Sequence, residues 1–248
     1  GIILPNSSVS AEKMKPLQSI FRNQSVCWIS HFAWRPSKLF DGANMLLAIW
    51  VIRSSSKEKC LTTKYNRWYR EYRDYLFPTL NYHEVSLLLG DFRIPKMPCP
   101  LAISVYQKCL NVSKGANLLS AADTGPYNLY YFRAVLYWFK VLIEPPIMEE
   151  DGKRTTTGEM KELTFSRKND RDVSYSLMAS NLFALHYVIW SSCQVVNSPD
   201  LMFPVNIRIL SQQYGNELAA ISVRLIRDVQ KRSIVQTRQY SARNREYT

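Results

Sequence analysis

The order of apolar segments over the first 52 residues is the feature that most constrains the fold. A short apolar run at 1–4 predicts a short buried strand, and it ends at the turn formers of 5–7. A helical segment follows, and its apolar face is formed by Met14, Leu17, Ile20 and Phe21. Pro16 favours a regular helix that starts near it, because a missing N–H is harmless in the first turn. Two β-rich runs come next, at 25–32 and 45–52. A strand, a helix and two closely spaced strands predict the end of an open α/β sheet that finishes in a hairpin.

The rest of the chain mixes helices and strands. Residues 64–77 predict a helix crowded with aromatic residues and arginines, and a series of prolines from Pro78 to Pro100 marks a boundary after it. Further helices are predicted at 101–110, 173–190 and 216–231, strands at 129–143 and 160–165, and an exposed loop at 149–159. The predicted buried stripe of the last helix consists of Leu218, Ile221, Leu225 and Val229. We therefore expect two domains, 1–80 and 81–248.

The charge is concentrated at the two ends of the chain. Residues 1–80 hold 12 Lys and Arg against 5 Asp and Glu, and residues 224–248 hold 7 against 2. The 13 basic and 13 acidic residues of 81–223 balance, so the net charge of +12 belongs to the ends. Basic surfaces that flank a neutral middle are typical of electrostatic footprints, and neutralisation of nucleic-acid phosphates is their usual role.

The cysteines and the apolar runs bear on the compartment. The five cysteines are scattered and form no C-x-x-C pair, which indicates reduced thiols in a cytoplasmic protein. The longest apolar runs fall short of the ~20 residues that span a bilayer, and we recognise no secretory leader, so we expect no membrane partner.

Several motifs of the chain resemble the late motifs of adenine-specific DNA methyltransferases from type IIG and type ISP restriction–modification systems. The first three are G-I-I-L-P-N-S (1–7), R-P-S-K-L-F-D-G (35–42) and L-L-A-I-W-V-I (46–52). The later ones are R-W-Y-R-E-Y-R-D-Y-L-F (67–77), L-Y-Y-F-R-A-V-L-Y-W-F-K (129–140), M-K-E-L-T-F (160–165), I-W-S-S-C (189–193) and the segment 227–247. The resemblance implies that 1–80 is the C-terminal part of a Rossmann-like methyltransferase sheet and that 81–248 is a mixed α+β target-recognition domain with a C-terminal helix and a basic tail.

The sequence departs from that family at its cofactor and catalytic motifs. None of the eight glycines forms a G-x-G pair for S-adenosylmethionine, and Glu144-Pro145-Pro146-Ile147 lacks the amide and the aromatic ring of the family's N-P-P-Y. In the family order these motifs precede Gly1. We therefore expect a fragment whose partner is a missing N-terminal methyltransferase half, with or without a nuclease domain. The fragment is expected to bind no S-adenosylmethionine and to transfer no methyl group by itself.

The resemblance places Phe40 where the family carries an aromatic residue that stacks on the flipped target adenine. An extruded base needs a flat apolar face to replace its lost stacking. The alternative is that Phe40 is a core or loop residue, in which case Trp34 is the next candidate. Arg35 and Lys38 flank the same loop and would face the backbone of duplex DNA, or would simply be solvated.

Further DNA-binding candidates are basic residues in aromatic or terminal segments: Arg67, Arg70, Arg73, Arg133, Lys140, Arg238, Arg243 and Arg245. For 67–77 the alternative is that the tyrosines pack the helix on its neighbour while the arginines stay in water. A charge within the aromatic run 129–143 needs a partner such as phosphate or a carboxylate. The tail arginines bind phosphate flexibly or belong to a frayed end.

Other functions have weaker support. A non-enzymatic DNA-specificity module would use the same basic ends. Glu159-Met160-Lys161 fits a minimal nuclease pattern but has no upstream carboxylate partner, and Ser191 lacks a G-x-S-x-G context. The three histidines, His31, His83 and His186, lie far apart in sequence, so no metal site is expected.

Overall fold

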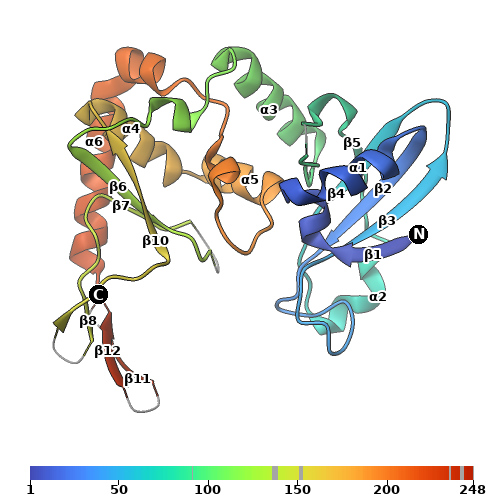
Figure 1. The fold of residues 1–248 in the computed structure, drawn as a ribbon, viewed down its shortest axis with the longest axis horizontal. Coiled ribbons are helices and arrows are strands. Elements are labelled where there is room, and N and C mark those ends of the chain that lie inside the picture. The colour runs from blue at the N-terminus through green and yellow to red at the C-terminus, as the bar shows by residue number, and fades with distance from the viewer. Residues whose placement is uncertain (91, 136–138, 151–152, 235, 241–242, 248) are drawn as a thin grey trace. The chain divides into compact units, whose positions relative to one another are not determined.

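The computed structural model describes residues 1–248 except 91, 136–138, 151–152, 235, 241–242 and 248, and it gives the backbone alone at 150, 236–240 and 243–247. The chain forms two compact units (Figure 1). The first comprises Gly1–Asn111 and Leu185–Cys193, and the second comprises Val112–Ala184 and Gln194–Thr248. This division by compactness comes later in the chain than the predicted boundary after residue 80, because 81–111 pack on the first sheet.

The first unit is built on a five-stranded mixed sheet in the order β1-β3-β2-β4-β5. Its strands are β1 (Ile2–Pro5), β2 (Ser25–Phe32), β3 (Leu47–Ser54), β4 (Lys59–Asn66) and β5 (His83–Glu84). Strands β1 and β2 both run antiparallel to β3, so they are parallel to each other, and β4 is parallel to β2. The helix α1 (Lys15–Arg22) connects β1 to β2, with Pro16 in its first turn. The predicted order of strand, helix and two strands is confirmed, and the unit is mixed α/β.

One detail of that prediction is wrong, since β1 is not buried. It is an edge strand, paired on one side only, and the side chains of Ile2 and Ile3 are 40% and 48% exposed. The apolar run therefore reports strand propensity rather than a central position in the sheet.

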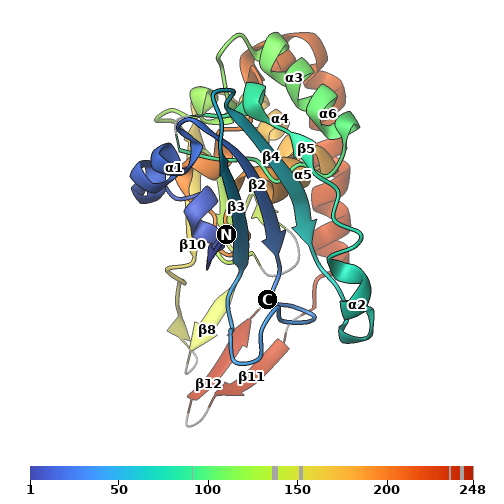
Figure 2. The ribbon, with the colours of Figure 1, turned by 90° about the vertical axis from the view of Figure 1, so that its right-hand side faces the viewer.

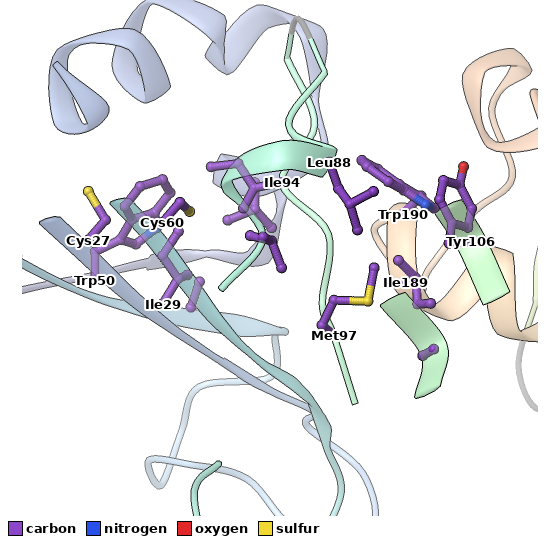
Figure 3. Close-up of a cluster of buried hydrophobic side chains, with 14 residues drawn as sticks. Cys27, Ile29, Trp50, Cys60, Leu88, Ile94, Met97, Tyr106, Ile189 and Trp190 are labelled. Carbon is purple, nitrogen blue, oxygen red and sulfur yellow. The ribbon is translucent and has the colours of Figure 1, made fainter. Parts of the chain in front are cut away.

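The core of the first unit lies against one face of this sheet. Cys27 and Ile29 of β2 and Trp50 of β3 contribute to it, and Ile94 and Met97 pack over them (Figure 3). Ile189 and Trp190 complete the same cluster from the segment that returns late in the chain, which is why 185–193 belongs to this unit. A smaller cluster on the other face consists of Phe32, Leu39, Leu47, Trp68 and Leu76.

The predicted helix over 64–77 is wrong. Residues 64–66 complete β4, and only a 3-10 turn at Arg70–Tyr72 and one helical turn, α2 (Arg73–Leu76), follow. Pairing with β2 extends β4 to Asn66, so strand pairing outweighs the helical spacing of the aromatic residues.

The second unit combines two small sheets with helices. One sheet has the order β10-β6-β7 and the other β11-β12-β8-β9. The strands are β6 (Tyr127–Phe132), β7 (Val141–Leu142), β8 (Met148–Glu150), β9 (Lys153–Arg154), β10 (Met160–Phe165), β11 (Gln236–Tyr240) and β12 (Arg243–Tyr247). The remaining helices of the chain are α3 (Pro100–Ser113), α4 (Lys168–Met178), α5 (Asn181–Trp190) and α6 (Ile207–Arg232), and α3 and α5 each contribute to both units. Short 3-10 helices lie at Asn6–Val9, Glu12–Met14, Ser86–Leu88, Leu118–Ala121 and Ser198–Leu201.

Several predicted elements need correction. The run 129–143 is divided between β6 and β7, with 136–138 outside the described residues, and the predicted loop 149–159 contains the β8–β9 pairing. The predicted helix 173–190 is two helices, α4 and α5. Its break is stabilised by Ser180, whose Oγ donates to the Leu177 carbonyl and accepts from the Phe183 N–H.

The last helix starts earlier than predicted and buries a different face. α6 bends at Tyr214, whose φ and ψ are −133° and 18°, and its buried residues are Ile207, Ser211, Gly215 and Ser222. Ile221 and Val229 of the predicted stripe are exposed. The small residues let α6 approach α4 closely, so that the Ser222 Oγ lies 2.6 Å from the Ser176 Oγ and donates to the Asp172 carbonyl.

Candidate nucleic-acid interface

Two irregular segments leave the first sheet at the same edge. Strands β1, β2 and β4 are parallel, so their carboxyl ends lie at one edge of the sheet. β2 continues into the edge loop, residues 33–46, and β4 continues into the edge segment, residues 67–77 (Figure 2). Ligands of open α/β sheets bind outside the carboxyl ends of the strands. This carboxyl edge, meaning the end of the sheet where the parallel strands terminate and not an edge strand, is therefore the candidate position of a ligand site.

The edge loop is anchored by one buried side chain. Leu39 is 2% exposed and packs in the small cluster with Phe32, Trp68 and Leu76. Arg73 of α2 stabilises the backbone of the loop at the same residue. Its Nη2 donates to the Leu39 carbonyl at 2.7 Å and its Nη1 to the Lys38 carbonyl at 3.3 Å. The loop and the edge segment thus hold each other in place.

Phe40, next in the chain, has the opposite environment. Its side chain is 42% exposed. It opens a tight turn in which the Ala43 N–H donates to the Phe40 carbonyl at 3.2 Å, and the turn requires the positive φ of +83° at Gly42. Phe40 is therefore not a core residue, and 42% of its side chain is open to solvent in a loop whose base is fixed.

The basic residues of the edge loop lie on either side of a cis Arg35–Pro36 peptide bond and near Phe40 in sequence. The Arg35 guanidinium lies over the Trp34 ring, with its Cζ 4.2 Å from the ring centroid. Lys38 is exposed beside buried Leu39. Because Arg35 covers a face of half-buried Trp34, Phe40 is the freer of the two aromatic candidates for stacking.

The edge segment presents its tyrosines to solvent. Tyr69, Tyr72 and Tyr75 are exposed, whereas Trp68 and Leu76 are buried in the small cluster. The alternative that these tyrosines pack the segment on its neighbour is wrong. Sequence reasoning missed them as site residues, since their spacing alone does not show which aromatic residues face inward.

The arginines of the edge segment have different roles. Arg67 places its Cζ 5.4 Å from the Tyr65 ring centroid. Burial raises the pKa of the Tyr65 hydroxyl, and Arg67 opposes this shift by its charge and a hydrogen bond. Arg70 is exposed. Arg73 supports the edge loop, a role that the predicted phosphate contact did not anticipate.

A buried polar network underlies this edge. The His31 Nδ1 lies 3.1 Å from the Asn6 Oδ1, at the end of β1. Asn66, at the end of β4, donates from Nδ2 to the His31 carbonyl at 2.9 Å and accepts from the Ala33 N–H at 2.9 Å. Burial, together with the charge of Lys96, lowers the pKa of His31 well below its usual value. The strand ends are therefore tied together directly below the edge loop.

The remaining predicted DNA-binding residues belong to the second unit. The Arg133 N–H donates to the Glu159 carbonyl, and exposed Lys140 places its Nζ 5.6 Å from the Phe132 ring centroid. Arg238 lies on β11, and Arg243 and Arg245 lie on β12, but their side chains are outside the described residues. Exposed basic residues of this unit that the sequence did not point to include Lys153, Arg154, Arg224, Arg227 and Lys231.

The structure offers little to the other functional candidates. Glu159 and Lys161 are exposed, and within the described residues no three or more His, Cys, Asp or Glu side chains gather as a metal site. An open hollow of about 730 Å³, lined in part by Arg22, Asn23 and Glu58, lies at the opposite edge of the sheet, near the start of β2. None of the helices in the described part is both long and apolar enough to cross a membrane.

Comparisons with known proteins returned no match. No protein-family model, no curated protein and no solved structure is significantly similar to the chain.

Proposed function

We propose that the chain binds duplex DNA and receives an extruded adenine on Phe40, as part of an adenine-specific DNA methyltransferase. The observation that carries this proposal is the contrast between buried Leu39 and exposed Phe40 at the carboxyl edge of the sheet. A fixed loop base with a free aromatic face is what an extruded base requires in place of its lost stacking.

Charge supports the same assignment. Arg35 and Lys38 are exposed on the edge loop, and Arg67 and Arg70 are exposed on the edge segment. Cations on both sides of a stacking residue would bind the phosphates next to the extruded nucleotide. On this proposal the basic residues of the second unit contact the flanking duplex and belong to the target-recognition region.

The sheet is compatible with a catalytic half that extends it. β1 and β2 form a parallel pair linked by α1, with β3 inserted between them, as expected for the closing end of an open α/β sheet. We propose that further strands of a Rossmann-like methyltransferase sheet pair with the free side of β1, where Ile2 and Ile3 are exposed.

The residues of this chain do not fit S-adenosylmethionine. Among the described glycines, positive φ occurs at Gly42, in the edge loop, and at Gly115, just after α3, and neither starts a helix after a strand. Pro145 and Pro146 belong to the second unit, where they line an apolar cavity. We therefore assign cofactor binding to the proposed N-terminal half, and this chain to base and phosphate binding.

A duplex with one 2-aminopurine opposite an abasic position tests the proposal without knowledge of the target sequence, because an unpaired base is extruded at little cost. The fluorescence of 2-aminopurine rises when the base leaves the helix and falls again when it stacks on an aromatic ring. Bound to the 248-residue chain, the base should be quenched by Phe40. Phe40→Ala should reduce the ratio of stacked to unstacked base roughly 5- to 150-fold, equivalent to ~1–3 kcal/mol of stacking, while duplex affinity changes little.

Two further variants sharpen this test. Phe40→Trp should restore quenching, since any broad ring offers the same surface. Tyr214→Ala removes an exposed aromatic residue from α6 and should leave the signal as in the unmodified chain. Unchanged 2-aminopurine fluorescence in Phe40→Ala, at full occupancy of the duplex, would refute the stacking role.

A further inference from the structure

A row of exposed tyrosines on the edge segment has no role in the function proposed above. Tyr69, Tyr72 and Tyr75 are 61%, 58% and 66% exposed. Large aromatic side chains are rarely left so open three times in seven residues, because each buries ~150–250 Å² when it packs. Such a surface calls for a ligand that covers it.

The backbone brings the three tyrosines together at intervals of about one turn. Residues 70–72 form a 3-10 turn, and α2 continues the segment from Arg73. The Tyr72 N–H donates to the Tyr69 carbonyl at 3.0 Å, which places these two residues one turn apart. One turn advances about 5–6 Å, so the backbone spaces successive tyrosines at about that interval. Trp68 and Leu76 hold the opposite side of the segment in the small cluster.

Cationic side chains accompany the row, and one of them ties it to the edge loop. Arg67 and Arg70 alternate with the tyrosines and are exposed, as are the carboxylates Glu71 and Asp74, so three arginines stand against two carboxylates in 67–75. Arg73 ties the edge segment to the edge loop through the carbonyls of Lys38 and Leu39, and both segments leave the same end of the sheet (Figure 2).

We propose that the tyrosine row binds unpaired nucleotides, with bases on the rings of Tyr69, Tyr72 and Tyr75 and phosphates on Arg67 and Arg70. Aromatic rings that alternate with cations are the usual chemistry for single-stranded nucleic acid, because every base has a π-face and every nucleotide a phosphate. The backbone interval of about 5–6 Å between tyrosines exceeds the ~3.4 Å between stacked bases of a duplex, so the row suits a strand that has left its partner. The inference rests on the proposed function, in which an extruded adenine opens the duplex beside this row.

The test compares single-stranded and duplex DNA on the 248-residue chain. The variant Tyr69→Ser/Tyr72→Ser/Tyr75→Ser removes the rings and leaves every charge in place, and Tyr214→Ser removes an equally exposed ring from α6. A fluorescent 20-nucleotide oligothymidine and a fully paired duplex of the same length are titrated at one salt concentration. The triple serine variant should lose affinity for oligothymidine by at least about fivefold per ring that contacts a base, with duplex affinity nearly unchanged.

A second triple variant keeps the rings. Tyr69→Phe/Tyr72→Phe/Tyr75→Phe should bind oligothymidine like the unmodified chain, because stacking needs the ring and not the hydroxyl group. Circular-dichroism melting checks that the variants fold, as expected for side chains more than half exposed.

Three results would overturn the proposal: the unmodified chain fails to bind oligothymidine, the serine variant binds it as well as the unmodified chain does, or the phenylalanine variant loses affinity for it like the serine variant. A loss of self-association in the serine variant, seen by light scattering with unchanged oligothymidine affinity, would also overturn it in favour of a protein interface. Failure of the proposed function gives a different signature, since Phe40→Ala would leave 2-aminopurine unchanged whatever the tyrosine variants do.

Discussion

Leu39 and Phe40 provide a sharp test of how the edge loop is built, because truncation of these adjacent apolar residues should lower the stability by very different amounts. Leu39→Ala removes a side chain that is 2% exposed from a cluster with Phe32, Trp68 and Leu76. Phe40→Ala removes a larger side chain that is 42% exposed and belongs to neither core cluster of the first unit. Residue size alone would predict the greater loss for Phe40.

The magnitudes follow from burial. Buried Leu→Ala substitutions cost about 2–5 kcal/mol, and a cluster of five residues at the base of a loop collapses more readily than a large core, so we expect about 2–3 kcal/mol for Leu39→Ala. An exposed side chain outside a packed core contributes little, so Phe40→Ala should change the free energy of unfolding by less than about 1 kcal/mol.

Urea unfolding followed by tryptophan fluorescence measures this in the relevant unit. Five of the six tryptophans belong to the first unit: Trp28, Trp34, Trp50, Trp68 and Trp190. With a denaturant slope of about 2 kcal/mol per molar urea, Leu39→Ala should lower the midpoint by about 1 M or more, and Phe40→Ala by less than half of that. If Phe40→Ala lowers the midpoint as much as Leu39→Ala does, Phe40 is a packing residue and the stacking role passes to Trp34.

Two further predictions concern the buried polar network and a close backbone approach. His31 is buried and its pKa is lowered, so below its pKa of ~6.5 in the unfolded chain, the unfolded chain binds a proton that the folded chain does not. The free energy of unfolding should therefore fall as the pH is lowered from 7 to 5, by at most ~1.36 kcal/mol per pH unit. His31→Gln should flatten that slope, and an unchanged slope would contradict the prediction. In Gly125→Ala the new Cβ would meet the Phe165 carbonyl and the Ser166 Cα, so the backbone must move and the second unit should lose about 3 kcal/mol, roughly 10 °C in melting temperature by circular dichroism. Gly158→Ala has open space around it and should melt like the unmodified chain; equal melting temperatures for both variants would refute the clash.

The sequence predicts those elements whose local pattern and burial agree. β2 and β10 have the predicted bounds, 25–32 and 160–165, and α1 carries Pro16 in its first turn. In the two strands the apolar residues that define the pattern also meet neighbouring elements, whereas in α1 Ile20 of the predicted apolar face is 71% exposed and the buried residue is Gln18. In the strands, local preference and tertiary contact therefore favour the same structure.

The edge segment shows where that agreement fails. The aromatic residues and arginines of 64–77 repeat at helical spacing, but most of the aromatic rings face solvent, and the buried apolar residues of the segment are Trp68 and Leu76. The first three residues pair with β2 instead. Aromatic residues at helical spacing indicate a helix only where one face of that helix packs on the protein. The sequence does not show which of these aromatic residues are buried.

The predicted buried face of the last helix is wrong for the complementary reason. Its large apolar residues suggest a buried stripe, whereas the face that meets α4 carries Ser211, Gly215 and Ser222. Close approach of two helices favours small side chains with hydrogen-bonding groups, and the Ser222 Oγ uses that closeness to reach the Asp172 carbonyl. Helix contacts made through small polar residues leave no hydrophobic signal for sequence reasoning to detect.

The position of the candidate site rests on the resemblance at 35–42 and stays a prediction, whereas the contacts that support the edge loop come from the structure alone. Whether Leu39 or Phe40 faces inward depends on a cluster assembled from Trp68 and Leu76, some thirty or more residues later in the chain. The role of Arg73 depends on the same assembly, since only the folded edge segment brings its guanidinium to the Lys38 and Leu39 carbonyls. A loop without secondary structure of its own can present a ring in a defined direction only when such distant contacts fix its base, so the residues that support this site are necessarily those that sequence patterns do not connect to it.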